Sequence, residues 1–385
     1  MSVPSCRILH VLPSLDQRYG GPLRLVLDLS ARALPLGLDS YVLGFGEPNL
    51  SDNPFPASRI HALPVAFPQS YCYSPSLASW LRENLAGFDG VVIHGAWLYP
   101  AWAAAHWCRR RGVPYACFPH GMLEPWAVNG QGWLKAMKKR VYWRWREHKI
   151  YAGARRAFFT THTERRLASG LFQFECPQEV LTPYGIETGV PAAPQPARPD
   201  LAQPPERRIA LFLGRVHPKK NAHFLLRAWA AAKVPPPWRL LIAGPGEEAY
   251  LSHLRHLAAD LGIAEQVVFT GFVAGQDKAY LLQRADWFLL PSQQENFGVA
   301  VFEALSHNCP VAISDRVYLA ETFPPGSEVL SLEFGAWVEF LKSRMADADW
   351  RNEVLRRDRE HLLARFSMEA VTVQWLDAMR RVFCP

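Results

Sequence analysis

The chain has 385 residues, a length that predicts two or three domains. Hydrophobic residues make up 49% of it, which is enough to form buried cores and excludes a globally disordered protein. The 42 Lys and Arg residues exceed the 35 Asp and Glu residues by +7, a basic balance that stays below the charge density of a dedicated nucleic-acid-binding protein.

The cysteines and the start of the chain indicate the compartment. The count of Cys is odd at 7, and no two are spaced as C-x-x-C, so we expect reduced packing residues of a cytosolic protein and neither a disulfide framework nor a zinc site. His10, Pro13 and Asp16 interrupt the first apolar stretch too early for a secretory signal. No apolar run approaches the ~20 residues of a membrane-spanning helix. We therefore expect a soluble protein, or one that sits on a membrane without crossing it.

Short apolar runs alternate with stretches of helical periodicity along the first half of the chain. A helix is expected over Pro22–Leu36, with Pro22 in the first turn where proline is tolerated. The strands expected here are Arg7–Leu12, Tyr41–Leu43, Val91–His94, Tyr115–Phe118, Ala157–Thr161 and Leu181–Ile186. Residues 188–206 then hold 6 prolines, which excludes a helix or a sheet interior and predicts a semi-rigid extended linker.

The same alternation restarts after this segment and ends in a helix from Ser367 to about Val382. The strands expected in the second half are Ile209–Leu213, Leu240–Ala243, Gln266–Phe269, Trp287–Leu290 and Val311–Ile313. Strand–helix alternation in both halves predicts an α/β protein with two doubly wound parallel sheets. Ligands of such sheets bind beyond the carboxyl ends of the strands, so we expect the site in the cleft between the two.

Two cations follow the first strand of the second half. Gly214 permits a tight exit from the strand, and Arg215 and Lys220 stand between the strand end and the next helix. A guanidinium fork and an ammonium at a helix start suit a diphosphate. A solvated basic loop is the alternative reading. The turn at Gly244-Pro245-Gly246 does not complete a dinucleotide fingerprint after a first strand, which argues against an NAD enzyme.

Two carboxylates, Glu295 and Glu303, flank the start of another expected helix. That helix begins near Gly298, and its free N–H groups, at Phe297–Val299, point to the same place. A helix N-terminus can bind phosphate, and a carboxylate can accept hydrogen bonds from ribose hydroxyls. Together they indicate a nucleotide-sugar pocket. The alternative is a helix-start acid and a solvated Glu, which fits less well because apolar residues surround Glu303.

The segment from Glu295 to Glu303 matches the E-x7-E element of retaining GT-B glycosyltransferases, and the chain resembles family 4 of that class. The resemblance extends along nearly the whole chain. Its other matches are Gly214-Arg215 with Lys220, Ala243-Gly244, Phe269-x-Gly271, Pro291-Ser292 and Glu303-Ala304-Leu305. The sequence departs from the family at Asn221, where Gly is usual, and in His307–Pro310, which lacks the usual Gly before Pro.

The resemblance implies a role for each site residue. Glu303 would bind the ribose hydroxyls, Glu295 would meet the transferred sugar, and Arg215 and Lys220 would hold the diphosphate as a leaving group. The further donor-binding residues would be Asn296, Phe297 and Gly298, together with the loop Gly20-Gly21 in the first half. An ordinary flexible turn is the alternative for that loop. His120 would lie near the transferred sugar, and His94 would line the pocket; for each, a structural His is the alternative.

The resemblance also implies the GT-B arrangement, two Rossmann-like domains facing each other across a cleft. We expect an acceptor-side domain over 1–187, the linker over 188–206, the nucleotide-sugar domain over 207–366, and a helix over 367–385 that crosses back to the first domain. Asp347-Ala348-Asp349 imitates a metal-binding D-x-D but reads as a helix cap, so we expect no metal and no cofactor.

Trp133–Arg156 is the most basic stretch of the chain. Helical periodicity places a basic face at Lys135, Lys138, Lys139, Tyr142, Arg146 and Lys149, and an apolar stripe at Leu134, Met137, Val141 and Trp145. The stripe could either enter the lipid or pack on the domain. We expect it to pack on the domain, and the basic face to contact anionic lipid on the inner face of the membrane. An ordinary surface helix is the alternative.

The sequence therefore predicts a cytoplasmic, peripheral glycosyltransferase that moves a sugar with retention from a nucleotide-diphospho-sugar to a glycan or lipid-linked saccharide, in surface polysaccharide synthesis. One alternative is a sugar-nucleotide epimerase of similar architecture. A second is a nucleic-acid-binding protein that uses the Trp/Arg-rich helix. That one leaves Glu295 and Glu303 unexplained, and we expect no nucleic-acid partner.

Overall fold

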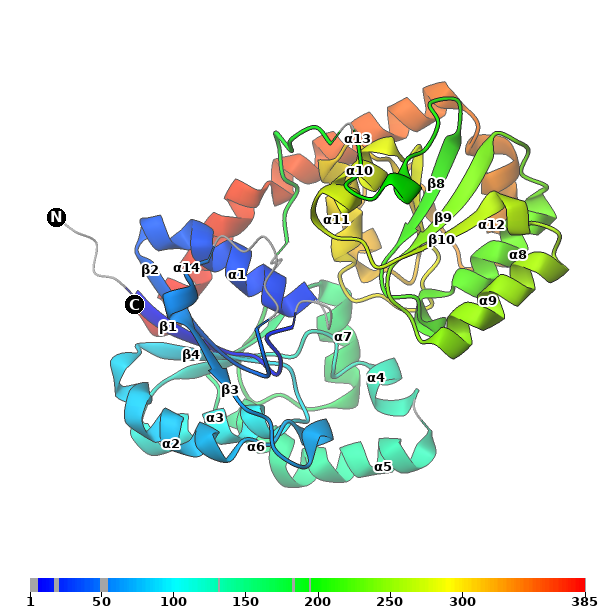
Figure 1. Cartoon of the computed structure of the whole chain (residues 1–385). Helices are drawn as coiled ribbons and strands as arrows, with labels where there is room; N and C mark the ends of the chain where they lie inside the picture. Colours follow the sequence, from blue (N-terminus) through cyan, green and yellow to red (C-terminus); the bar gives the residue numbers. More distant parts are fainter. Residues whose placement is uncertain are drawn as a thin grey trace. The chain divides into compact units, whose positions relative to one another are not determined.

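The structure, a computed structural model, describes residues 6–16, 21–48, 55–130, 132–181, 184–193 and 195–384. It divides into two compact units, each built on one sheet (Figure 1). Unit 1 comprises Met1–Tyr184 and Glu369–Pro385, and unit 2 comprises Gly185–Met368. Within the described residues, no helix has the length and apolar character needed to cross a bilayer.

Unit 1 contains a seven-stranded sheet in the order β3-β2-β1-β4-β5-β6-β7. Its strands are β1 (Cys6–Val11), β2 (Leu38–Phe45), β3 (Ile60–Leu63), β4 (Gly90–His94), β5 (Tyr115–Phe118), β6 (Arg156–Phe159) and β7 (Gln178–Val180). Every neighbouring pair is parallel. The chain starts in the middle of the sheet and winds toward both edges, so the strand order reverses between β1 and β4. A switch point of this kind is where doubly wound sheets bind ligands.

Helices connect these strands and cover the sheet. They are α1 (Gly21–Ala33), α2 (Pro75–Asn84), α3 (Tyr99–Arg111), α4 (Pro125–Asn129), α5 (Trp133–Tyr142), α6 (His148–Ala152), α7 (His162–Leu171) and the C-terminal α14 (Met368–Phe383). A π-helical segment, Trp143–Glu147, joins α5 to α6. From α14, Trp375 is fully buried and the Val382 carbonyl accepts a hydrogen bond from Arg155 at 2.8 Å. The end of the chain is thus an integral part of unit 1.

One expectation about the cysteines is wrong. Cys6, the first residue of β1, forms a disulfide with Cys384, just beyond α14, and the two Cα atoms are 6.1 Å apart. The pairing depends on α14 returning to unit 1, a contact between residues 378 positions apart that no local spacing reveals. The other 5 cysteines are free and buried, as expected of packing residues.

Unit 2 contains a six-stranded parallel sheet in the order β10-β9-β8-β11-β12-β13. Its strands are β8 (Arg208–Leu213), β9 (Trp238–Ala243), β10 (Val267–Gly271), β11 (Trp287–Leu290), β12 (Val311–Ser314) and β13 (Val329–Leu330). Its helices are α8 (Ala222–Ala232), α9 (Glu248–Asp260), α10 (Gly275–Arg284), α11 (Val299–Ser306), α12 (Phe334–Glu339) and α13 (Ala348–Phe366). The prediction of two doubly wound parallel sheets is confirmed.

The proline-rich segment is hydrogen-bonded to α10 of unit 2. The backbone N–H of Ala193 donates to Gln283 at 2.7 Å, that of Ala197 donates to Asp277 at 2.7 Å, and that of Gln203 donates to Tyr280 at 2.9 Å. The described part of this segment therefore belongs to the body of unit 2, whereas its prolines alone predicted an extended linker.

Two strands were missed and one was misplaced. β3 and β13 are short and have no fully buried residue, so neither shows the apolar run that marks a core strand. The strand expected over Leu181–Ile186 lies earlier, as β7, and Ile186 pairs only with Ser367 in an isolated bridge. Residues 182 and 183 lie outside the described part of the chain.

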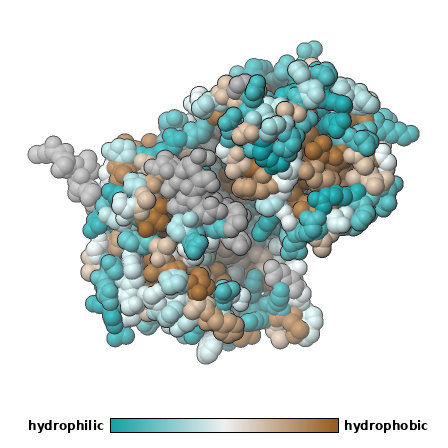
Figure 2. Space-filling view, viewed as in Figure 1, coloured by the Kyte–Doolittle hydropathy of each residue, from teal (hydrophilic) through white to brown (hydrophobic). Residues whose placement is uncertain are grey.

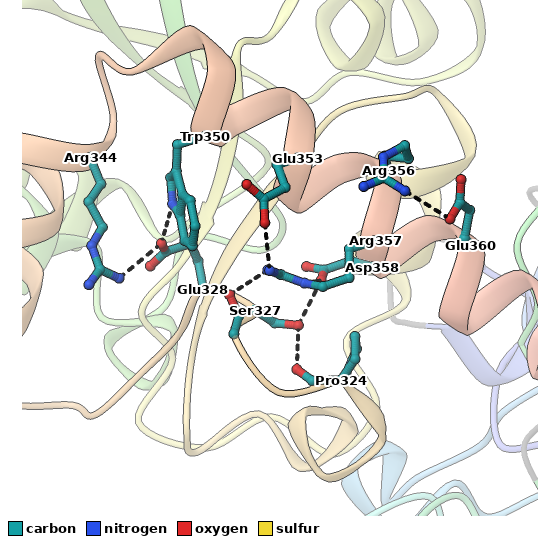
Figure 3. A network of polar contacts seen from close by, with 11 residues as sticks. Pro324, Ser327, Glu328, Arg344, Trp350, Glu353, Arg356, Arg357, Asp358 and Glu360 are labelled. Carbon is teal, nitrogen blue, oxygen red and sulfur yellow. Dashed lines mark hydrogen bonds and ion pairs between the residues drawn. The ribbon is translucent and has the colours of Figure 1, made fainter.

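A polar network fastens α13 to the loop before β13 (Figure 3). The buried carboxylate of Glu328 accepts from Trp350 at 2.6 Å and from Arg344 at 3.2 Å, and Ser327 donates to Asp358 at 2.7 Å. Ahead of it, Asp347 caps the start of α13 by accepting from the backbone N–H groups of residues 349 and 350, each at 3.0 Å. The prediction that Asp347 is a helix cap is confirmed.

Candidate active site

In unit 2, the loops that follow β8 and β9 are joined at the carboxyl edge of the sheet. Val216 N–H donates to the Pro245 carbonyl at 2.7 Å, and Gly214 N–H donates to the Ala243 carbonyl at 3.0 Å. Gly244 has a φ of +136°, and a Cβ there would overlap the Gly214 carbonyl, so only glycine fits. This close approach sets the path of the loop that carries Arg215 and Lys220.

Lys220 forms an ion pair with Glu295, which joins the loop after β8 to the loop after β11. Because β8 and β11 are neighbours in the sheet, the two loops lie side by side, and Gln293 N–H donates to the Lys219 carbonyl at 2.9 Å. Burial, and then the neighbouring cations Lys219 and Arg215, lower the pKa of Lys220 to about 7. The Glu295 carboxylate opposes this shift because it favours the charged ammonium.

Arg215 is the exposed cation of the same loop, and it has no ion pair with any residue that the structure describes. A guanidinium in this position remains available to an incoming anion. Arg215 and Lys220 therefore differ: the first faces solvent, whereas the second is already paired with a carboxylate. The sequence predicted both cations at this edge, and the structure places both there.

The second carboxylate, Glu303, lies within α11 and pairs with Lys278 of α10 at 2.6 Å. α11 begins after Gly298, whose φ of +71° is in the left-handed region that glycine readily adopts. A Cβ on Gly298 would contact the Glu295 side chain at 3.4 Å, so Glu295 lies at the N-terminal end of this helix. First-turn N–H groups point out of an α-helix at that end and favour anions there.

Two asparagines explain the departures from the family pattern. Asn221 has a φ of +65° and Asn308 has a φ of +57°, both in the left-handed region. Asn tolerates this conformation better than other residues that carry a Cβ. Asn221, where the resembled family has Gly, and Asn308, in the segment before Pro310, therefore adopt a left-handed backbone that glycine adopts more readily.

In unit 1, three histidines form a hydrogen-bonded row at the switch point of the sheet. Nδ1 of His10, on β1, is 3.1 Å from Nε2 of His94, at the end of β4. Nδ1 of His94 is 2.8 Å from Nε2 of His120, just after β5. Burial lowers the pKa of His10 and of His120 to about 3; burial, and then the neighbouring His120 and His10, lower the pKa of His94 well below its usual value. All three rings are therefore neutral near pH 7.

His120 is the outermost ring of this row and is partly exposed, whereas His94 is only 3% exposed and lies behind it. The prediction placed His94 in the lining of a pocket, and unit 1 instead buries it between two imidazoles. The backbone beside His120 is held by the buried Glu164, which accepts from Gly121 N–H at 2.7 Å and from Thr160 N–H at 2.6 Å. Glu164 thus ties the loop that presents His120 to the residue that follows β6.

The remaining predicted residues have simpler surroundings. Gly20 lies outside the described residues, and Gly21 is the first residue of α1. Phe297 is buried and stacks on Phe302, with ring centroids 5.2 Å apart, so its side chain supports the loop from inside. Asn296 is half-buried beside it. Among the described residues, one group brings three possible metal ligands together, Cys6, Asp89 and Cys384, and two of these form the disulfide.

The orientation predicted for the basic helix is wrong. Leu134, Met137, Val141 and Trp145 are exposed, by 53% to 71%, and do not pack on the domain. Two cations of the expected basic face turn inward instead. Lys139 donates to the Ala127 carbonyl at 2.5 Å, and the Arg146 guanidinium lies 4.8 Å from the centre of the Trp102 ring.

Sequence reasoning missed three residues that contact the predicted site residues: His10, Glu164 and Lys278. His10 carries a signal, since it is a polar residue inside an apolar strand. Glu164 carries another, because Thr161 and Glu164 have the spacing of a capping box, and Thr161 accepts from Glu164 N–H at 3.0 Å. Nothing local pairs Lys278 with Glu303, which lies 25 residues away.

Two family models match the chain. Residues 20–185 match the glycosyl transferase 4-like domain, and residues 195–343 match the glycosyl transferases group 1. A D-inositol 3-phosphate glycosyltransferase of Mycobacterium tuberculosis is 29% identical over 243 residues, 61% of this chain and 50% of the relative. The chain thus spans about half the length of this curated relative.

Solved structures share the fold over nearly the whole chain. Anabaena Alr3699/HepE, in complex with UDP and glucose, is similar with a TM-score of 0.77 and 16% identity, covering 98% of this chain and 100% of that one. WaaG, a glycosyltransferase involved in lipopolysaccharide biosynthesis, is similar with a TM-score of 0.70 and 16% identity, at the same coverage.

Proposed function

We propose that this chain, which belongs to the GT-B glycosyltransferases of family 4, moves a sugar from a nucleotide-diphospho-sugar to a hydroxyl of a glycan or lipid-linked saccharide, with retention of configuration and without a metal. The observation that carries the donor proposal is the ion pair between Lys220 and Glu295, which brings the basic loop that also carries Arg215 beside the start of α11 in unit 2. HepE, a structural neighbour, is solved with UDP and glucose. Surface polysaccharide synthesis is the proposed setting, and WaaG acts in lipopolysaccharide biosynthesis.

In the proposed reaction, the bond between the anomeric carbon and the β-phosphate oxygen breaks. The nucleoside diphosphate leaves with the electron pair, and Arg215 and Lys220 stabilise its charge. The leaving phosphate accepts the proton of the acceptor hydroxyl, which attacks from the same face. The protein then contributes orientation and electrostatic stabilisation, and two cations with a helix N-terminus supply what a metal would otherwise supply.

Two ion pairs at the candidate site, Lys220 with Glu295 and Lys278 with Glu303, suggest how the site receives the donor. When a diphosphate arrives, Lys220 exchanges the Glu295 carboxylate for phosphate oxygens, and Glu295 becomes free to accept hydrogen bonds from hydroxyls of the transferred sugar. Glu303, held by Lys278, accepts from the ribose hydroxyls. Each carboxylate thus has a cationic partner until its hydroxyl partner binds.

The decisive test is a binding panel of nucleoside diphosphates and their sugars, followed by product analysis. Wild type should bind the diphosphate of one nucleoside with higher affinity than the corresponding monophosphate. NMR of the product should show that the transferred sugar keeps the anomeric configuration of the donor. Glu303→Gln should lose affinity, whereas the exposed Glu265→Gln should not. Conversion of the donor into its epimer without an acceptor would support the epimerase alternative instead.

We further propose that α5 docks the enzyme on an acidic membrane, on its cytoplasmic face. The exposed apolar stripe of Leu134, Met137, Val141 and Trp145 is joined by Trp133, which is 73% exposed. Figure 2 shows hydrophobic surface beside hydrophilic surface in the region of unit 1 where α5 lies. The exposed cations that flank the stripe are Lys135, Lys138, Arg140, Arg144 and Lys149.

An exposed apolar stripe bordered by cations matches the two layers of a membrane surface, acyl chains and acidic headgroups. The stripe would enter the lipid, and the cations would contact phosphates. This reverses the arrangement expected from the sequence, in which the basic face alone touched the membrane. A lipid-linked acceptor would then reach the enzyme within the plane of the membrane.

A further inference from the structure

His10 and His94 have no part in the donor site, yet they form a continuous row with His120 at the switch point of unit 1. β1 and β4 are paired in register, with His10 opposite Val92 and Val11 opposite Ile93, and β5 pairs with β4 on its other side. The row therefore crosses three adjacent strands. It ends at Trp375 of α14, whose ring stacks on His10 with centroids 5.6 Å apart and an interplanar angle of 22°.

The row allows only two arrangements of its protons. Each neutral imidazole carries one N–H and one bare nitrogen. His94 is bonded on both sides, so it must donate to one neighbour and accept from the other. In the first arrangement every N–H is on Nδ1, and the row donates from His10 toward His120. In the second every N–H is on Nε2, and the row donates from His120 toward His10.

The inner end of the row favours the first arrangement. Nε2 of His10 is fully buried and has no hydrogen-bond partner among the described residues. In the second arrangement this atom is a buried N–H without an acceptor, and the near-parallel Trp375 ring does not offer its face to an in-plane N–H. In the first arrangement it is a bare nitrogen. Orphaned buried N–H groups are rare in proteins because leaving the donor unpaired costs the full desolvation penalty.

We propose that His94 and His10 are positioning residues that hold His120 as the Nδ1–H tautomer, so that His120 donates a hydrogen bond to an oxygen of the bound sugar. Its Nε2 accepts from His94 and its Nδ1 carries the proton, so His120 keeps no lone pair with which to act as a general base. That this oxygen belongs to a sugar rests on the proposed function, whereas the tautomer of His120 does not depend on it.

The stacking of the rings supports a fixed orientation for His120. Its ring lies against Phe118 with centroids 4.1 Å apart and an interplanar angle of 16°, and against His94 at 5.1 Å and 12°. The backbone of His120 has a φ of +50°, a conformation uncommon for a residue with a Cβ. With the Glu164 anchor on Gly121, these contacts leave the Nδ1–H one direction in which to point.

The test is long-range ¹H–¹⁵N NMR of the ¹⁵N-histidine-labelled full chain, which distinguishes a protonated ring nitrogen from a bare one. Resonances are assigned with single histidine variants. We expect Nδ1–H for His10, His94 and His120 at pH 7 without any ligand. A His120 that carries its proton on Nε2 would overturn the proposal. This readout needs no substrate, so it separates the tautomer from the proposed glycosyl transfer.

The variant His94→Phe removes the donor to His120, and His10→Phe removes the inner end of the row while keeping a ring beside Trp375. In His94→Phe we expect His120 to populate the Nε2–H tautomer, and kcat to fall about 3- to 12-fold with the donor KM near that of wild type. His61→Phe, at a half-buried ring that stacks on Tyr41 elsewhere in unit 1, is the matched control and should change neither. An unchanged His120 tautomer in His94→Phe and in His10→Phe would refute the role of both residues.

Discussion

Lys220 and Glu295 form an ion pair between the loops that follow two neighbouring strands of unit 2, β8 and β11. Each side chain serves as the charged partner of the other until a ligand arrives. Both are half-buried, and an unpaired charge there would be costly. A ligand that binds both must carry an anion for the ammonium and hydrogen-bond donors for the carboxylate. A sugar joined to a diphosphate has both.

Removing the acid of this pair should strengthen the binding of a nucleoside diphosphate. In Glu295→Gln, Lys220 has no carboxylate to exchange, so we expect affinity for the nucleoside diphosphate to rise about tenfold while transfer of the sugar is lost. Lys220→Ala should weaken the same affinity by ~10- to 150-fold. Isothermal titration measures both, with Lys342→Ala, an exposed lysine of unit 2, as the control. Affinity that does not rise in Glu295→Gln and does not fall in Lys220→Ala would show that the pair is structural.

Variants of the second ion pair, Lys278 with Glu303, should distinguish a residue that contacts the donor from one that supports it. Glu303→Ala removes the proposed ribose ligand, so donor affinity should fall by ~10- to 150-fold while the fold survives. Lys278→Ala leaves Glu303 in place without its ion-pair partner. We expect a smaller loss of donor affinity, which high salt does not change. Steady-state kinetics at subsaturating donor measures both. If Glu303→Ala kept the turnover of wild type, Glu303 would not belong to the donor site.

Diphosphate binding should depend on pH near neutrality. The pKa of Lys220 is lowered to about 7, chiefly by burial, so its ammonium is lost as the pH rises through 7 in the free protein. An anion favours the charged form, so binding above pH 7 should take up a proton and weaken as the pH rises from 6 to 8. Titration in two buffers of different ionisation enthalpy counts that proton. Lys220→Arg keeps its charge throughout and should show no such uptake.

Activity should persist in excess EDTA, because Arg215, Lys220 and the start of α11 neutralise the diphosphate. Asp347→Ala should lower the free energy of unfolding by ~1 kcal/mol through loss of the α13 cap, and should leave turnover unchanged. Activity lost to the chelator and restored by Mg²⁺ or Mn²⁺ would contradict the metal-free proposal.

Membrane docking should depend on both the apolar stripe and the exposed cations of the segment that runs from α5 into α6. Changing Leu134, Met137, Val141 and Trp145 to Ser should abolish cosedimentation with acidic vesicles, because the stripe no longer enters the lipid. Changing Lys135, Lys138, Arg140 and Lys149 to Glu should weaken binding, by about 1 kcal/mol for each cation lost, and reduce its dependence on salt. The variant Lys342→Glu, whose lysine lies outside α5, is the control. Equal binding by wild type and the stripe variant would eliminate α5 as the anchor.

The strands that lie in the cores were predictable because burial on both faces leaves a local apolar run. β5 and β11 have the predicted limits, and most other core strands differ by a few residues. The cations and acids of the donor loops were also predictable, since they immediately follow such runs. β3 and β13, at sheet edges, lack that signal, and their assignment depended on the strand beside them.

The sequence by itself determined the α/β class, the two doubly wound parallel sheets and the residue types at the strand ends, because side-chain periodicity and turn residues act over a few positions. Tertiary structure alone decided which groups meet. It paired Cys6 with Cys384, Lys278 with Glu303 and His10 with His94, all distant in the chain. It also decided which face of α5 points outward. Helical periodicity separates an apolar stripe from a basic face, but only the surface on which the helix packs determines which of them is buried.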